Sequence, residues 1–497
     1  MSRRLSALGI AILVLFGIVA GQSANIQFFR ASSLNQSSEN PRVTEASTVY
    51  PRGDIYAANG QTLAESVATS SSYYPWRRVY PLGRLVSGIV GFSGPAYGQW
   101  ALEQEYDDYL TAHSQPPQSV AQLLAPTKAA DSITLTLYPS LQAVAARAMG
   151  GQDGAAVVLN PKNGDVLAMY SNPTFNPVPL TSPTFSVAAA AWKTDTTDDA
   201  HGFPPLGLVA TQQTFPPGST FKVVTTAAVV AHDPSLLSKR FHYGAYTALP
   251  DSNKLLYNDG GTACGGTIAE MLPVSCDPGY ALVGLALGGS TLTETAEAFG
   301  YNSVPPLDLP YVVASSFPAS FVGNLPFVAY SAIGQGNVRS TALQDALVAS
   351  GVANGGAIMT PHLLDYVSGP DGTLVKRYQP SIWLQPLTAS QAAQIVPLMV
   401  NVARFGTAAG IFPYDLDVAA KTGTAQTGNS LKNTDDWMIA FAPATDPTVA
   451  VAVVMPFQAE SAFGATVAGP IVKCLIEATL ALQSGHKVAG TSTTCPV

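Results

Sequence analysis

Charged residues are scarce in this sequence. Only 11% of its 497 residues are Asp, Glu, Lys or Arg, whereas soluble proteins average about 25%. The net charge is −8, so the basic excess that binds nucleic-acid phosphates is missing. Disorder is excluded too, because disordered chains have few apolar residues, and here 47% are hydrophobic. The composition predicts a folded protein that does not bind nucleic acid.

A surface with so few carboxylates changes little in charge when carboxylates protonate near pH 4. Polar uncharged residues must cover that surface instead. We hypothesise from this feature that the protein works in an acidic environment.

Long hydrophobic runs are also few, and only residues 5–21 form one without a charge. Arg3 and Arg4 precede it. The run is near the minimum length for a membrane-spanning helix, and basic residues at its start keep that end in the cytoplasm. A cleaved signal peptide is the alternative, but Gln22 fits poorly two positions before the small Ala24. We therefore expect a single-pass cell-membrane protein with an extracytoplasmic body.

Several signatures of common enzyme classes are absent. The four cysteines form no C-x-x-C pair, and there is no HExxH, GxSxG or GxxxxGK[ST] motif. Zinc sites, redox pairs and phosphate-binding loops are therefore not indicated, and we expect neither a metal nor an organic cofactor. An even number of cysteines in an exported chain permits disulfides.

The chain divides into four expected segments. Residues 1–30 are a cytoplasmic stub and anchor, residues 31–131 a linker and small mixed module, residues 132–485 the main domain, and residues 486–497 a polar tail. In the main domain, two hairpins, an apolar helix after residue 219 and a closing helix over 471–482 are predicted. This order predicts an α+β domain, with an antiparallel sheet flanked by helices.

The strongest local feature is Ser219-x-x-Lys222, which follows Pro-Pro-Gly and precedes an apolar helix. This spacing places the serine at a helix N-terminus and the lysine one turn later on the same face. A lysine there could take the proton of the serine hydroxyl, provided that its pKa is lowered. An ordinary N-cap serine is the alternative. A second match, Ser484-x-x-Lys487, lies in the polar tail.

The second feature is Lys421-Thr422-Gly423-Thr424, which follows residues 415–420, a predicted strand. Lys421 and the two hydroxyls could bind a carboxylate. Glycine in a strand lets a substrate backbone approach closely, although an ordinary strand-to-loop transition has the same pattern.

The two motifs together, in this order, resemble those of the penicillin-binding protein and serine β-lactamase superfamily. Arg52-Gly-Asp-Ile55 and Arg78-Val-Tyr-Pro-Leu-Gly83 resemble the N-terminal module of its class B members. The segment 154–172 and the block Ile333-Gly-Gln-Gly336 resemble their transpeptidase domain. The sequence around Tyr257 to Cys264 points more narrowly to the actinobacterial group of these proteins.

The resemblance implies roles for individual residues. Ser219 would be the acylated nucleophile, Lys222 its general base, and Lys421 would orient and polarise the site. Thr422 and Thr424 would bind the terminal carboxylate of the substrate beside Gly423. Backbone N–H groups of Ser219 and Thr424 would form the oxyanion hole. The reaction would be D,D-transpeptidation between peptidoglycan stem peptides, inhibited by β-lactams.

The family also uses a Ser-x-Asn motif, and here the matching segment is Ser275-Cys276-Asp277. Ser275 could still pass a proton to the leaving amine. Asp277 would add negative charge beside Lys222 and raise the pKa of that lysine. Three interpretations follow: an active enzyme with altered activity, a non-catalytic scaffold, or an enzyme whose Asp277 is protonated at work.

The resemblance also implies a disulfide between Cys264 and Cys276, which would fix the loop of Ser275. As a partner it implies a membrane glycan polymerase of the shape, elongation, division and sporulation type. A carboxypeptidase or β-lactamase type hydrolase and a scaffold that recruits wall-synthesis proteins are the alternatives to a transpeptidase. Cys474 and Cys495 suggest no definite pairing.

Overall fold

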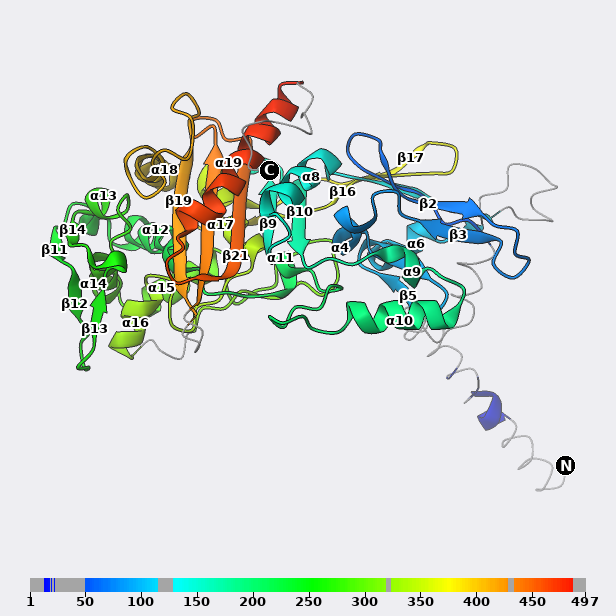
Figure 1. The fold of residues 1–497 in the computed structure, drawn as a ribbon, viewed down its shortest axis with the longest axis horizontal. Helices are drawn as coiled ribbons and strands as arrows, with labels where there is room; N and C mark the ends of the chain where they lie inside the picture. The colour runs from blue at the N-terminus through cyan, green and yellow to red at the C-terminus, as the bar shows by residue number, and fades with distance from the viewer. Residues whose placement is uncertain are drawn as a thin grey trace.

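Two sheets organise the chain (Figure 1). The computed structural model describes residues 13–17, 19, 22, 50–114, 128–318, 323–427 and 433–485. One sheet has six strands in the order β17-β16-β8-β1-β2-β3, and the other has five in the order β10-β9-β21-β20-β19. The predicted mixture of an antiparallel sheet and helices is confirmed, with further small sheets around them.

The six-stranded sheet combines distant parts of the sequence. Three strands come from its beginning, namely β1 Ile55–Tyr56, β2 Thr62–Ala68 and β3 Trp76–Val79. The other three are β8 Ser132–Leu135, β16 Leu364–Ser368 and β17 Leu374–Arg377. Strand β8 pairs in parallel with β1 and antiparallel with β16. The small module and the main domain therefore share one sheet.

The five-stranded sheet is the centre of the main domain. Its strands are β9 Gly154–Leu159, β10 Val166–Asn172, β19 Ala419–Gln426, β20 Asn433–Ala442 and β21 Val449–Ala459. Helices α8 Pro139–Met149 and α19 Gly464–Gln483 pack together on one face, and α17 Ala342–Ala353 packs on the other. Both faces are covered, which explains the continuous apolar runs. Strand β19 remains at the edge.

A mainly helical lobe faces that edge strand (Figure 1). Its principal helices are α12 Lys222–His232, α14 Asp277–Leu287, α15 Gly289–Ala298, α16 Leu325–Ser331 and α18 Ala389–Phe405. Helix α12 packs against α14, α15 and α18. The lobe also carries four short strands, β11 Phe241–Gly244, β12 Tyr246–Ala248, β13 Leu255–Tyr257 and β14 Cys264–Gly266.

A buried ion network holds the small module together. Glu103 is fully buried and accepts hydrogen bonds from Arg52 at 3.0 Å and from Arg78 at 2.5 Å. Tyr80 donates a further hydrogen bond to it. Burial alone would raise the pKa of Glu103, but the two arginines together lower it below its ordinary value. Loss of one partner would leave a buried charge uncompensated.

The expected membrane anchor lies mostly outside the described residues. Within 5–21 the structure describes residues 13–17 and 19, which are helical, with exposed side chains such as Leu13 and Phe16. One helix in the described part of the chain is long and apolar enough to cross a membrane, namely α19. Half of it is buried, and it packs on β20 and β21, so it is a core helix of the main domain.

The strand predicted over 415–420 is wrong in its first part, because β19 begins at Ala419. Asp417 belongs to a loop instead, where its backbone carbonyl and carboxylate accept the N–H groups of Ala444 and Thr445. These bonds attach the loop to the turn between β20 and β21. The sequence pattern of residues 415–420 does not show that this segment is bonded to a turn and not to a neighbouring strand.

Three buried carboxyls have raised pKa values, which predicts how stability depends on pH. Burial raises the pKa of Asp345 and of Asp435 to about 6 and that of Asp436 to about 7. The folded chain therefore binds more protons than the unfolded chain, where carboxyls titrate near 3.9. Their stabilising effect is fully present below about pH 4 and is lost as pH rises to about 7. The pKa of Glu103 is lowered, so its contribution is lost in stronger acid.

We predict maximal stability near pH 4 to 5 and a loss on the order of a few kcal/mol by pH 8. Thermal unfolding of the full chain in detergent micelles across this range measures it. The Asp436→Asn variant should lose less stability between pH 5 and 8 than the parent, because asparagine does not ionise. In the parent, ionisation of Asp436 buries a charge whose two oxygens have no hydrogen-bond partner. A stability optimum above pH 7 would contradict the prediction.

Candidate active site

Ser219 lies on a short 3-10 turn, Gly218–Phe221, directly before α12. The helix predicted to follow residue 219 is present, with this turn in front of it. Gly218 has φ +55°, and a Cβ there would lie 2.9 Å from the carbonyl oxygen of Thr424. Glycine therefore lets the turn approach β19 closely. No described residue makes a hydrogen bond with the Ser219 hydroxyl.

Lys222 is fully buried at the start of α12, and its Nζ is surrounded by three acceptors. It donates to the carbonyl oxygen of Ser275 at 2.6 Å, to Asp277 Oδ1 at 2.7 Å and to the Ser275 hydroxyl at 3.3 Å. These bonds occupy the ammonium group and leave no hydrogen bond to Ser219. Lys222 is therefore held beside Ser219 with the hydrogen-bond partners of an ammonium group.

Lys421 approaches the same serine from the sheet. It is fully buried on β19 and donates to the Ser275 hydroxyl at 2.9 Å and to the carbonyl oxygen of Thr422 at 2.8 Å. The structure thus places Lys222 and Lys421, 199 positions apart in the sequence, on one hydroxyl group. Ser275 is the residue that connects the two lysines.

The charges at this point are unbalanced. Burial lowers the pKa of Lys222, against the opposing effect of Asp277. Burial and the neighbouring Lys222 lower the pKa of Lys421 much further. Because two ammonium groups at such close range repel each other, the structure favours a neutral Lys421 beside a cationic Lys222. A neutral lysine beside Ser275 can accept a proton through that hydroxyl.

The segment that carries Ser275 is locally strained and held from both sides. Ser275 has φ +56°, a conformation that residues other than glycine rarely adopt. A disulfide joins the next residue, Cys276, to Cys264 on β14. The side chain of Asn258 accepts the backbone N–H of Asp277 at 3.0 Å. The disulfide is the one that the resemblance implied, and Cys495 lies outside the described residues.

Thr422 and Thr424 both line the cavity. The Thr422 hydroxyl is hydrogen-bonded to Thr407 at 2.6 Å, and the Thr424 hydroxyl accepts the N–H of Gly464 at 3.2 Å. Glycine at position 423 was expected to let a substrate approach, but the structure shows that its small size also serves packing within the protein. A Cβ there would lie 2.8 Å from the carbonyl oxygen of Pro217, so its small size lets β19 pack on the Ser219 turn.

A cavity of about 360 Å³ lies at this place. Five of the expected site residues line it, namely Ser219, Ser275, Asp277, Thr422 and Thr424. Lys222, Lys421 and Gly423 lie behind its wall. Sequence reasoning missed its other polar walls, which are Asn258, Asp259, Thr407 and the start of α19. Asn258 could have been found from the sequence, because it lies in the segment from Tyr257 to Cys264 that resembles the actinobacterial proteins.

Three other described residues could offer ligand atoms to a metal. Atoms of Asp153, Asp199 and His201 lie within 4.8 Å of one another, outside this cavity. They already pair among themselves, because Asp153 contacts the His201 ring and Asp199 accepts the backbone N–H of His201 at 2.8 Å. This cluster therefore needs no ion to account for its geometry.

Comparison with known proteins identifies the family. The model of the penicillin-binding protein transpeptidase domain matches residues 154–477, and that of the penicillin-binding protein A dimerisation domain matches residues 52–130. The chain belongs to the penicillin-binding protein transpeptidase family. The resemblance inferred from the motifs is thereby confirmed.

The chain is similar to known proteins over most of its length. Peptidoglycan D,D-transpeptidase PbpA of Mycolicibacterium smegmatis is 34% identical over 97% of this chain and 99% of its own length. A crystal structure of PBPA from Mycobacterium tuberculosis has a TM-score of 0.77 and 32% identity, and the match covers 86% of this chain and 99% of that one. The penicillin G acyl-enzyme complex of the same protein gives the same values.

We predict that Asp277→Asn accelerates acylation by a fluorescent penicillin about tenfold at pH 7. The substitution removes the negative charge that holds Lys222 cationic, and such a charge shifts a lysine pKa by one unit or more. Asp198→Asn is the matched control, because Asp198 is exposed and does not line the cavity. A variant no faster than the parent at neutral pH would rule out this account of Asp277.

We also predict that Cys264→Ser with Cys276→Ser destabilises the chain by about 3 kcal/mol, as expected for a disulfide that closes a loop of this length. The sequence separation is 12 residues. Acylation should slow as well, since Ser275 loses the constraint on its left-handed conformation. Denaturant unfolding of the full chain measures the first effect. Peptide mapping without reduction that finds both thiols free would contradict the pairing.

Proposed function

We propose that this chain is a peptidoglycan D,D-transpeptidase that works through a Ser219 acyl-enzyme. The observation that carries the proposal is the convergence of Lys222 and Lys421 on Ser275 within one cavity that also exposes Ser219 and Thr424. Family membership supports it, because relatives with this name cover nearly the whole chain.

Acylation begins when the Ser219 oxygen attacks the carbonyl carbon of the penultimate D-alanine of a donor stem peptide. Lys222, once deprotonated, accepts the hydroxyl proton. The tetrahedral intermediate places its negative oxygen between the backbone N–H groups of Ser219 and Thr424. Collapse breaks the peptide bond and releases the terminal D-alanine. Its amine receives a proton from Ser275, and Lys222 replaces that proton with the one it took from Ser219, through its hydrogen bond to the Ser275 hydroxyl.

Transfer completes the reaction. An amine of a neighbouring stem peptide attacks the acyl-enzyme carbonyl, and its proton passes through Ser275 to Lys222. The bond to Ser219 breaks, the Ser219 oxygen takes the proton from Lys222, and the new amide bond is the cross-link. The hydroxyls of Thr422 and Thr424 bind the donor carboxylate beside Gly423, and Lys421 orients and polarises the site.

Asp277 determines when Lys222 can act. In the structure its carboxylate accepts a hydrogen bond from the ammonium group. If the proton shifts from Lys222 to Asp277, both groups become neutral, which suits their burial better than a pair of charges. Lys222 is then a base, and the protonated carboxyl approximates the amide that other family members have at this position.

The rest of the chain suits work at a membrane. We propose that residues 1–30 form a cytoplasmic stub and a retained anchor, with the body outside the cell. Residues 31–131 would be the module that faces a membrane glycan polymerase, residues 132–485 the transpeptidase domain, and residues 486–497 a tail. The polymerase supplies the glycan, and stem peptides on that glycan are the substrates.

One observation favours a second candidate function. Lys222 is held cationic by three acceptors, and a cationic lysine cannot activate Ser219. If Asp277 keeps this state at every pH, the protein would be a scaffold that recruits wall-synthesis proteins. The hydrolase alternative has no comparable observation in its favour.

The first test is fluorescent penicillin labelling of the full chain from pH 3 to 8. We expect labelling that Ser219→Ala abolishes, because Ser219 lines the cavity from the turn before α12 and its hydroxyl has no hydrogen-bond partner among the described residues. Ser484→Ala is the matched control, since it belongs to the second Ser-x-x-Lys sequence, and it should leave labelling unchanged. Absence of Ser219-dependent labelling at every pH favours the scaffold.

Product analysis then separates the transferase from a hydrolase. With a stem-peptide donor and an amine acceptor, we expect released D-alanine and a cross-linked product in comparable amounts. Release of D-alanine without cross-linked product would identify a carboxypeptidase.

A further inference from the structure

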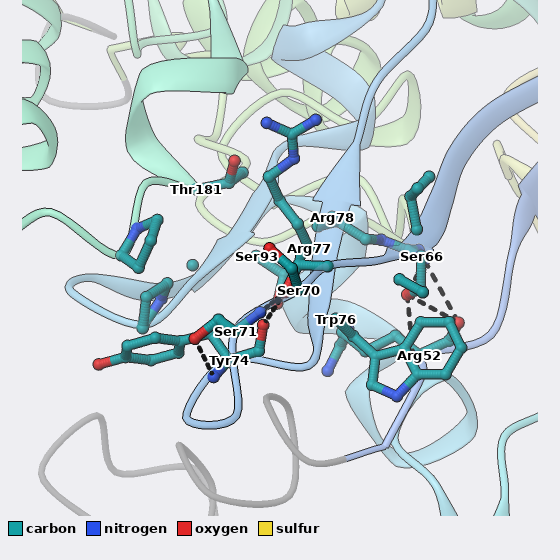
Figure 2. Close-up of a pocket in the computed structure, with 16 residues that line it drawn as sticks. Arg52, Ser66, Ser70, Ser71, Tyr74, Trp76, Arg77, Arg78, Ser93 and Thr181 are labelled. Carbon is teal, nitrogen blue, oxygen red and sulfur yellow. Dashed lines mark hydrogen bonds between the residues drawn. The ribbon is translucent and has the colours of Figure 1, made fainter.

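A second cavity is lined by β2 and β3 of the small module. These strands lie at the opposite end of the molecule from the helical lobe (Figure 1). The volume of this cavity is about 450 Å³, larger than that of the active-site cavity, and the two share no lining residue. Figure 2 shows its walls, which come from β2, β3 and the loop between them on one side and from the Ser93 and Thr181 segments on the other. Nothing in the proposed catalysis uses it.

The cavity follows the outer edge of a sheet. Strand β3 is the last strand of the six-stranded order and pairs with β2 only. In an antiparallel pair, alternate residues direct their backbone N–H and C=O groups away from the partner strand. Among the described residues no other strand pairs with Trp76–Val79 on that outer side. The cavity therefore adjoins an edge strand, whose outward backbone groups can accept another strand.

The charge of the cavity is of one sign. Arg52, Arg77 and Arg78 line it, and no acidic residue does. Arg52 and Arg78 are buried and fixed by Glu103, and Arg78 Nη2 has no hydrogen-bond partner. Arg77 is exposed, and no acidic side chain among the described residues pairs with it. In a chain with net charge −8, this groove is a local cationic site.

The wall beside the groove is preformed. The loop between β2 and β3 is closed by the bond from the N–H of Thr69 to the carbonyl oxygen of Pro75 at 2.8 Å. Ser71 is bonded to Thr69, and the N–H of Tyr74 donates to the Ser71 hydroxyl at 3.1 Å. These bonds fix the loop next to Trp76, so little ordering is needed when a ligand binds.

We propose that this groove binds an extended acidic segment of a partner protein, which adds as a seventh strand to β3 and places a carboxylate on Arg77. Strand addition supplies main-chain hydrogen bonds, and the pockets between alternate side chains supply selectivity. A carboxylate and the Arg77 guanidinium form the charge-assisted pair that arginine geometry favours. The proposal goes beyond transpeptidation and does not depend on it.

Charge and stereochemistry argue against two other occupants. Pairing of β3 with β3 of a second copy would bring Arg77 of each chain next to the arginines of the other, and like charges across a strand pair are destabilising. A peptidoglycan stem peptide carries carboxylates, but its D-residues cannot continue a regular strand ladder of L-residues.

The test uses the full chain in detergent micelles and fluorescence anisotropy with an acetylated octapeptide of alternating glutamate and valine. We expect saturable binding that weakens as salt rises from 50 to 300 mM, because a charge pair contributes. Arg77→Glu should weaken binding at least tenfold. The matched control is Arg147→Glu, an exposed arginine on α8 that lines neither cavity, which should leave binding unchanged.

Three further probes decide between the occupants. The same peptide with N-methyl groups on alternate residues should lose binding, since it cannot form the ladder. Equal binding of that peptide, or of a glutamine and valine peptide, would overturn the proposal. A soluble stem pentapeptide that binds as tightly, or dimers that dissociate on Arg77→Glu, would overturn it in favour of those occupants. Penicillin labelling of Arg77→Glu should equal that of the parent, so failure here is separate from failure of the catalytic proposal.

Discussion

Two fully buried lysines share one serine hydroxyl and one carboxylate, and the rest of the active site depends on this shortage of negative charge. Asp277 is the one carboxylate among the described residues that is hydrogen-bonded to either lysine, and Asp259 acts on Lys222 without such a bond, so burial of both Lys222 and Lys421 as cations is disfavoured. The site therefore favours one cationic and one neutral amine. Ser275 is hydrogen-bonded to both amines, so in the proposed mechanism protons pass through its hydroxyl.

The surrounding structure serves to hold Ser275 at this point. Its backbone is in a conformation that a non-glycine residue rarely adopts, and the disulfide to Cys264 together with Asn258 stabilises it. The same segment starts α14 with Asp277, so the position of the carboxylate is fixed by the helix start. An isolated Ser-x-Asp sequence would have none of these constraints.

Motif spacing was sufficient to predict that Ser219, Lys222 and Lys421 lie near one another, because helix geometry makes Ser219 and Lys222 neighbours and a strand presents Lys421; their catalytic roles remain proposals. The α+β fold followed from hairpins and helices that are local in sequence. Thr407 and the start of α19 could not be predicted, since they reach the cavity only through tertiary packing. Nor could the sheet that joins β1 to β8 and β16, because the paired residues Ile55, Ile133 and Val367 lie far apart in the sequence and leave no local pattern. At Gly423 the packing against Pro217 was not foreseen.

The shared six-stranded sheet has a mechanical consequence. Strand β16 starts beside His362, which bridges to Asp165 at the foot of β10 and so connects this sheet to the catalytic one. A force on β3 is therefore transmitted through the paired strands of the six-stranded sheet, and then through the contact of His362 with Asp165, to the catalytic sheet. The small module and the catalytic domain should therefore move as one rigid unit. A partner bound to the far end of the module can set the orientation of the active site relative to the membrane.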